Sequence, residues 1–126
     1  MPLLAGLPLR IIDHQEGTSF DLASVTLEGG NVQIRIWRER GPIHTGFSSL
    51  TARFQSFDSL FIMKWLGLST SQGLTGTNIS AVLKGVAQFL VRCWHDIDVA
   101  FSQETAPRTI AELERIRLAY DKARWC

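Results

Sequence analysis

The expected fold follows from one stretch, residues 20–39, which reads FDLASVTLEGGNVQIRIWRE. On both sides of its glycine pair, apolar and polar residues alternate with a period of two, the pattern of strands with one dry and one wet face. Gly29 and Gly30 accept positive φ at little cost, so the pair permits a tight turn. We therefore predict an antiparallel hairpin here.

Strand character continues on both sides of this hairpin. Upstream, Leu9–Asp13 is predicted to form a short first strand. Downstream, Pro42 lacks a backbone donor and marks a turn into another strand, Ile43–Ser49. The first half of the chain is therefore expected to be an antiparallel β-meander of about four strands.

Helical periodicity replaces the strand pattern after Gln55. Ser56 or Asp58 can cap a helix over Phe57–Leu66, and Gly67 is suited to end it. The apolar positions of this helix are Leu60, Ile62, Met63 and Leu66.

Two further helices are predicted. Asn78 opens the longest amphipathic pattern, which ends near Phe101. Thr109 is predicted to begin the last helix, because Glu112 follows at the spacing of a capping box. The expected buried positions of the two helices are Ile79, Val82, Leu83, Val86, Leu90, Cys93 and Ile97, and then Ile110, Leu113, Ile116 and Tyr120.

The order of elements predicts the fold class. Strands come first and helices follow, so the pattern favours an α+β fold over alternating βαβ units. A chain of 126 residues is near the usual size of one domain. We predict a single domain over residues 1–126, in which the N-terminal meander packs against two to three C-terminal α-helices.

Charge and hydropathy limit the classes of partner. The chain has 13 Lys and Arg against 12 Asp and Glu, a formal net charge of +1. Such a balance produces no field that would recruit nucleic acid or an anionic membrane, and no run of predominantly apolar residues reaches the roughly 18 residues that span a bilayer. We therefore expect a protein partner, and neither membrane nor direct nucleic-acid binding.

Cysteine usage and the N-terminal residues indicate the compartment. Cys93 lies in a predicted helix and Cys126 is the last residue, so neither a disulfide framework nor a metal quartet is indicated. The first residues, MPLLAGLPLR, lack the basic start of a signal peptide. The expected location is the cytoplasm.

Three histidines leave a catalytic alternative open. His14, His44 and His95 could serve a small hydrolase or nuclease, since imidazole titrates near neutral pH. A solvated or locally hydrogen-bonded role is the favoured interpretation for each of them. The chain has no nucleophile elbow and no phosphate-binding loop. We therefore assign no catalytic residue and expect a protein that is not an enzyme.

A metal or cofactor is not expected either. Cys93, His95 and Asp98 are ligand types within one helical segment. A stable tetrahedral zinc site needs a fourth ligand and supporting hydrogen bonds, which these three residues alone do not supply.

The clearest candidate for recognition is the polar face of the second hairpin strand. Gln33, Arg35, Trp37 and Glu39 alternate with the core positions and share one face. Trp and Arg are the residues most enriched at binding hot spots, so we predict a partner-binding face here. The alternative is that Trp37 packs under a loop while Arg35 pairs with Glu39.

Five segments carry a family resemblance: Ile12–His14, Ser19–Leu27, Val32–Gly41, Ile97–Phe101 and Thr109–Leu113. In their order and character the chain resembles small immunity proteins that accompany bacterial polymorphic or contact-dependent growth inhibition toxins. The resemblance implies a non-enzymatic inhibitor that binds one cognate toxin domain in the cytoplasm and occludes its active site or substrate path. A regulatory interaction module with no toxin partner remains a further alternative.

Overall fold

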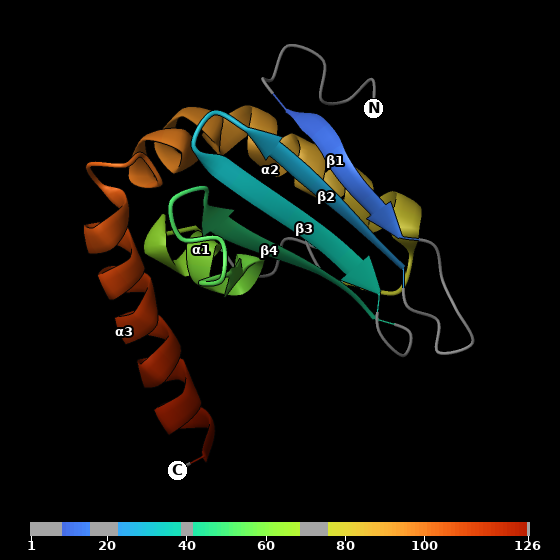
Figure 1. Cartoon of the computed structure of the whole chain (residues 1–126). Helices are drawn as coiled ribbons and strands as arrows, with labels where there is room; N and C mark the ends of the chain where they lie inside the picture. Colours follow the sequence, from blue (N-terminus) through green and yellow to red (C-terminus); the bar gives the residue numbers. More distant parts are fainter. Residues whose placement is uncertain (1–8, 16–22, 39–41, 69–75, 126) are drawn as a thin grey trace.

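The structure is a computed structural model that describes residues 9–15, 23–38, 42–68 and 76–125, with only the backbone of residues 14, 15, 23, 124 and 125. Its strands form one antiparallel sheet in the order of the sequence, as the predicted meander requires (Figure 1). The strands are β1 (Arg10–Gln15), β2 (Ala23–Gly29), β3 (Val32–Arg38), β4 (Ile43–Ser49) and β5 (Phe57–Asp58).

Three helices follow the strands, which confirms the α+β fold class. They are α1 (Ser59–Trp65), α2 (Ile79–Ala100) and α3 (Ala106–Trp125). The long helix α2 crosses behind the sheet, and α3 lies beside α1 and extends away from the strands (Figure 1). None of these helices is long and apolar enough to cross a bilayer.

The core lies between one face of the sheet and α2. We call this face of the sheet the inner face and the opposite one the outer face. The ring of Phe47 on β4 meets that of Phe89 on α2 edge to face, with centroids 5.9 Å apart. The buried side chains of the inner face are Leu27, Ile34, Ile36, Ile43 and Phe47. Those of α2 that meet this face are Val86, Phe89, Leu90, Cys93 and Ile97. Fully burying such a side chain contributes about 1.5–3 kcal/mol to folding.

The α2 positions were predicted well with two differences. Asn78 caps the helix, its side-chain oxygen accepting from Ala81 N at 3.0 Å, and the helix ends at Phe101 as expected. Ile79, however, is 47% exposed, so its expected burial is wrong. It lies in the first turn, beyond the part of the helix that the sheet covers. Phe89 is buried although the predicted apolar stripe omitted it.

The hairpin turn between β2 and β3 is docked on the end of α2. Asn31 donates from its backbone N to Asp98 Oδ1 at 2.8 Å, and from its side-chain amide to Asp98 O at 3.1 Å. Gly30 has φ +54°, and a Cβ there would lie 2.3 Å from Asp98 Oδ1. Gly30 of the predicted pair is therefore required by both the backbone angle and the packing, whereas Gly29 is the last residue of β2 and its φ is not positive.

The boundaries of α1 and β1 differ from those expected. The first helix begins at Ser59, because Phe57 and Asp58 pair with β4 as a short fifth strand and Asp58 then caps the helix. Its end is as predicted, since Gly67 has φ +75°. Strand β1 runs from Arg10 to Gln15 and not from Leu9 to Asp13.

The capping box predicted at the start of the last helix is wrong. Helix α3 begins three residues earlier, at Ala106. Thr109 lies inside it and donates its hydroxyl to Ala100 O at 2.7 Å, which joins α3 to the end of α2. Glu112 instead accepts a 2.6 Å hydrogen bond from Trp65 Nε1, which joins α3 to α1.

Candidate functional site

The outer face of the sheet carries the predicted recognition residues. The register pairs Trp37 with Ser24 and His44, and Arg35 with Thr26 and Gly46. Opposite residues of antiparallel strands point to the same side. The polar face of β3 is therefore continuous with that of β2 and β4, on the side of the sheet away from α2.

Trp37 lies across β4 above Gly46. A Cβ on Gly46 would be 2.7 Å from Ser56 Oγ and 3.2 Å from the Trp37 ring, so Gly46 leaves the space that both occupy. Trp37 is half-buried as a result. The alternative that Trp37 packs beneath neighbouring groups is thus partly correct, although one part of its surface stays in contact with solvent.

Arg35 and His44 flank this tryptophan. The Arg35 guanidinium carbon lies 5.4 Å from the centroid of the Trp37 ring, a cation–π contact. The His44 ring lies 5.5 Å from Trp37 and is tilted by 33°. Arg35 is exposed, and it makes no ion pair with any carboxylate in the described part of the chain. Its charge is therefore positioned by the stack but not neutralised there.

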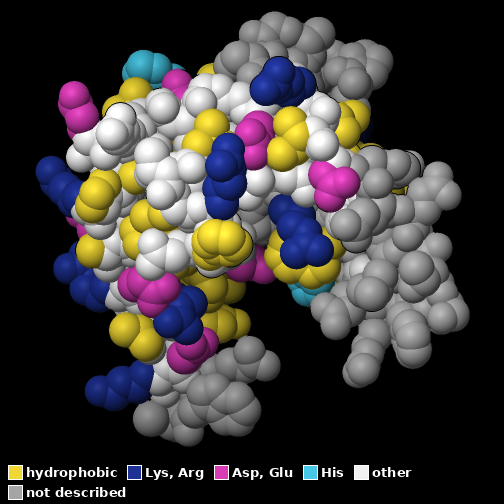
Figure 2. All heavy atoms as spheres, in the orientation of Figure 1, with side chains coloured by type: hydrophobic (Ala, Val, Ile, Leu, Met, Phe, Trp, Pro, Cys, Tyr) yellow, Lys and Arg dark blue, Asp and Glu magenta, His cyan; other side chains and the backbone are white. Residues whose placement is uncertain are grey.

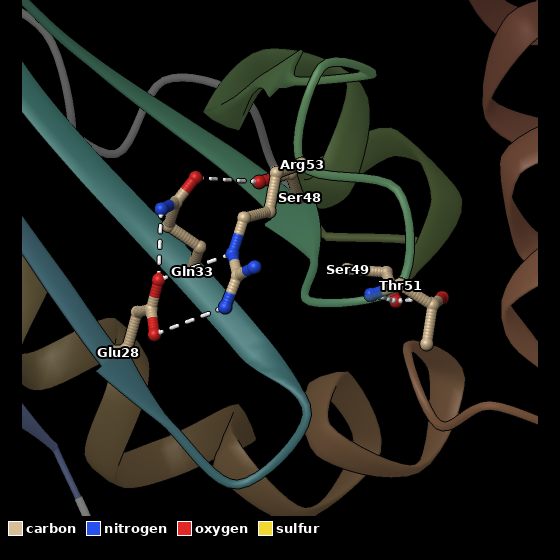
Figure 3. A network of polar contacts seen from close by, with 6 residues as sticks. All are labelled: Glu28, Gln33, Ser48, Ser49, Thr51 and Arg53. Carbon is tan, nitrogen blue, oxygen red and sulfur yellow. Dashed lines mark hydrogen bonds and ion pairs between the residues drawn. The ribbon is translucent and has the colours of Figure 1, made fainter.

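A polar network closes the end of the face nearest the β2–β3 turn (Figure 3). Gln33 donates to Glu28 Oε2 at 3.0 Å and accepts from the Ser48 hydroxyl at 3.3 Å. Arg53, from the loop after β4, forms an ion pair with Glu28, with Nε and Oε2 3.3 Å apart. Because the side chain of Glu28 is only 14% exposed, this pair is better shielded from water than most surface pairs.

The structure divides the four predicted contact residues. Arg35 and Trp37 form one cluster, which we call the Arg35–Trp37 stack. Gln33 faces the same side, but both ends of its amide are used within the network. Glu39 lies outside the described residues, so its predicted pairing with Arg35 stays a prediction.

The predicted contact residues did not include His44, which lies beside Trp37, or Arg53, which pairs with Glu28. For His44 no clear signal existed, because a two-residue turn at Gly41 and Pro42 would place Trp37 opposite Gly46. The observed register instead pairs Trp37 with His44. For Arg53 there was no signal either, since its partner Glu28 is 25 residues away in the sequence.

The histidines of the catalytic alternative are not brought together in the described part of the molecule. His44 is on the outer face of the sheet, whereas His95 is exposed on α2, which packs against the inner face. His14 directly follows the strand predicted over Leu9–Asp13 but belongs to β1, opposite Val25, and its side chain lies outside the described atoms.

The possible ligands on α2 do not converge either. Burial raises the pKa of the Cys93 thiol; nearby Arg92 lowers it and Asp96 raises it to smaller extents. The Asp98 carboxylate is engaged with Asn31, and His95 points away from the core. Within the described residues, no group of three or more His, Cys, Asp or Glu side chains is arranged to hold a metal ion.

The electrostatics of the face are mixed. The view of Figure 2 looks onto the outer side of the sheet, where basic, acidic and hydrophobic side chains are interspersed among polar ones. No extended patch of a single sign is visible on this face. Such a surface suits a protein partner with local complementarity better than a polyanion.

Comparison of the chain with protein-family models, curated proteins and solved structures found no match.

Proposed function

We infer that the chain is a non-enzymatic binding protein whose outer sheet face contacts a partner protein. The observation that carries this proposal is the Arg35–Trp37 stack, in which an exposed guanidinium without a described carboxylate partner is held over a half-buried indole. Rings and forked cations held in place lose little conformational freedom on binding, and this is why Trp and Arg dominate binding hot spots.

The partner that we propose is the toxic domain of a bacterial toxin, which the chain would bind in the cytoplasm and thereby neutralise. This part rests on the resemblance of segments such as Val32–Gly41 to immunity proteins. The Arg35–Trp37 stack lies within that same segment. A contact centred there would need about 800 Å² on each partner, most of the outer face of a small sheet.

The experiment is a binding measurement with the protein encoded next to this chain. The two proteins are purified separately, and their affinity is measured by titration calorimetry for wild type, Arg35→Ala, Trp37→Ala and the double variant. Loss of a hot-spot side chain costs about 2 kcal/mol, so each single variant should bind about 30-fold more weakly.

Arg92→Ala is the matched control, because Arg92 is exposed on α2, on the other side of the sheet. It should bind like the wild type. Urea unfolding of each variant excludes a loss of fold. Unchanged affinity of the Arg35→Ala, Trp37→Ala double variant would remove this face from the proposal, and absence of any complex would remove the neighbouring toxin as partner.

A further inference from the structure

The loop between β4 and β5 presents a fully exposed aromatic side chain, that of Phe54. Single exposed apolar side chains are common on protein surfaces and carry no function by themselves. Phe54 differs from the other exposed large hydrophobic side chains of the described residues because it is the most exposed and lies in a loop, whereas the others lie in β1, α2 or α3.

Two consecutive turns fix this loop. Ala52 N donates to Ser49 O and Gln55 N donates to Ala52 O, both at 3.0 Å, so Arg53 and Phe54 form the corner of the second turn. The Ser49 hydroxyl donates to Phe101 O at 2.9 Å and lies 2.8 Å from the hydroxyl oxygen of Thr51. The start of the loop is thereby attached to the end of α2.

The ion pair between Arg53 and Glu28 attaches the corner of the turn to β2, on the outer side of the sheet (Figure 3). At the end of the loop, Ser56 lies beside the Trp37 ring above Gly46. The loop therefore reaches the Arg35–Trp37 stack through Ser56 and the polar network through Arg53, and Phe54 lies between these two attachments, at the border of the same face.

We propose that Phe54 is the apolar anchor of this face and inserts into a hydrophobic pocket on the partner protein. This inference rests on the proposed function and names the chemistry of the partner surface. That surface carries a pocket wide enough for a phenyl ring, and beside it a carboxylate for the Arg35 guanidinium, which forms no ion pair with a carboxylate of the described residues. A ring on a fixed turn binds with little loss of backbone entropy, as an anchor residue requires.

The first test uses the protein encoded next to this chain as the probe. Phe54→Ser should weaken binding about 30-fold, and Phe54→Leu should weaken it less, since leucine keeps part of the apolar contact. Glu28→Gln, which releases Arg53 from its ion pair, should reduce the affinity by a smaller factor through a less ordered turn. Val91→Ser is the matched control, as Val91 is exposed on α2.

The pattern of losses separates the two proposals. If Arg35→Ala and Trp37→Ala weaken binding and Phe54→Ser does not, the anchor is wrong and the face remains. If only Phe54→Ser weakens binding, the loop is the contact and the Arg35–Trp37 stack is not.

A second measurement covers the case in which the neighbouring protein does not bind. The photoreactive residue p-benzoylphenylalanine is placed at position 54, and at position 91 as control, in the native cells. An adduct specific to position 54, mapped to an apolar pocket beside an acidic side chain, supports the anchor. Equal labelling from both positions, or no adduct from position 54, overturns it.

Discussion

At the scale of single residues, Gly30 and Gly67 are a matched pair of glycines with positive φ. Both lie in the left-handed region, but a Cβ on Gly67 meets nothing within 4 Å, whereas one on Gly30 meets Asp98 Oδ1. Substitution by alanine should lower the free energy of unfolding by about 1–2 kcal/mol at either site, because an L-residue disfavours this backbone angle. At Gly30 it also displaces the carboxylate that binds Asn31, which should cost about 1 kcal/mol more.

Urea unfolding of Gly30→Ala and Gly67→Ala measures this difference. Adding Asp98→Ala should remove the excess, so Gly30→Ala should cost about the same as Gly67→Ala in that background. Equal losses in the wild-type background would contradict the packing argument. The sequence predicted the glycine turn from its local pattern, but the contact with Asp98, 67 residues away from Asn31, depends on how the elements pack.

At the scale of elements, the junction of α1 and α3 predicts a pH dependence. The Trp65 indole donates to Glu112 and is the main cause that lowers the pKa of this carboxyl; Arg108 lowers it further. A lowered folded-state pKa favours the folded state at every pH above the ordinary Glu value of about 4.3. This contribution is lost as the pH falls through the lower folded pKa.

NMR titration of the Glu112 side-chain carboxyl carbon tests this prediction. Trp65→Phe, which keeps an aromatic ring but removes the donor, should move the Glu112 titration toward its ordinary range. Glu112→Gln should destabilise the protein at neutral pH and have less effect in acid. An unchanged Glu112 titration in Trp65→Phe would show that the hydrogen bond is not the cause of the lowered pKa.

The same junction shows where local sequence patterns fail. Thr109 and Glu112 have the spacing of a capping box, yet each is used for a contact with another element, Ala100 at the end of α2 and Trp65 at the end of α1. A short motif of two residues fits many local environments. Helix α3 begins at Ala106, three residues before the predicted start, because the chain turns immediately after α2, through Ser102 and Thr105.

At the scale of the whole molecule, the period of the sequence was enough to predict the architecture. Alternation over β2 and β3 defined the two faces of the sheet, and the stripe along α2 defined the helix that covers one of them. The candidate site was predicted only in part. The alternation of the sequence places Arg35 and Trp37 on this face. The position of Ser56 beside Gly46 and the path of the loop with Phe54 depend instead on the pairing of β5 with β4.

This two-sided sheet predicts that stability and binding can be separated by substitution. Phe47→Ala on the inner face leaves a cavity against Phe89, and it should lower the free energy of unfolding by about 3–5 kcal/mol. Arg35→Ala on the outer face removes an exposed side chain whose described contact is the cation–π contact with Trp37, so the change should stay within about 1 kcal/mol. Urea unfolding of both variants provides the measurement. If Arg35→Ala cost as much as Phe47→Ala, the outer face would be part of the folding core, and the Arg35–Trp37 stack would be explained by stability without any partner.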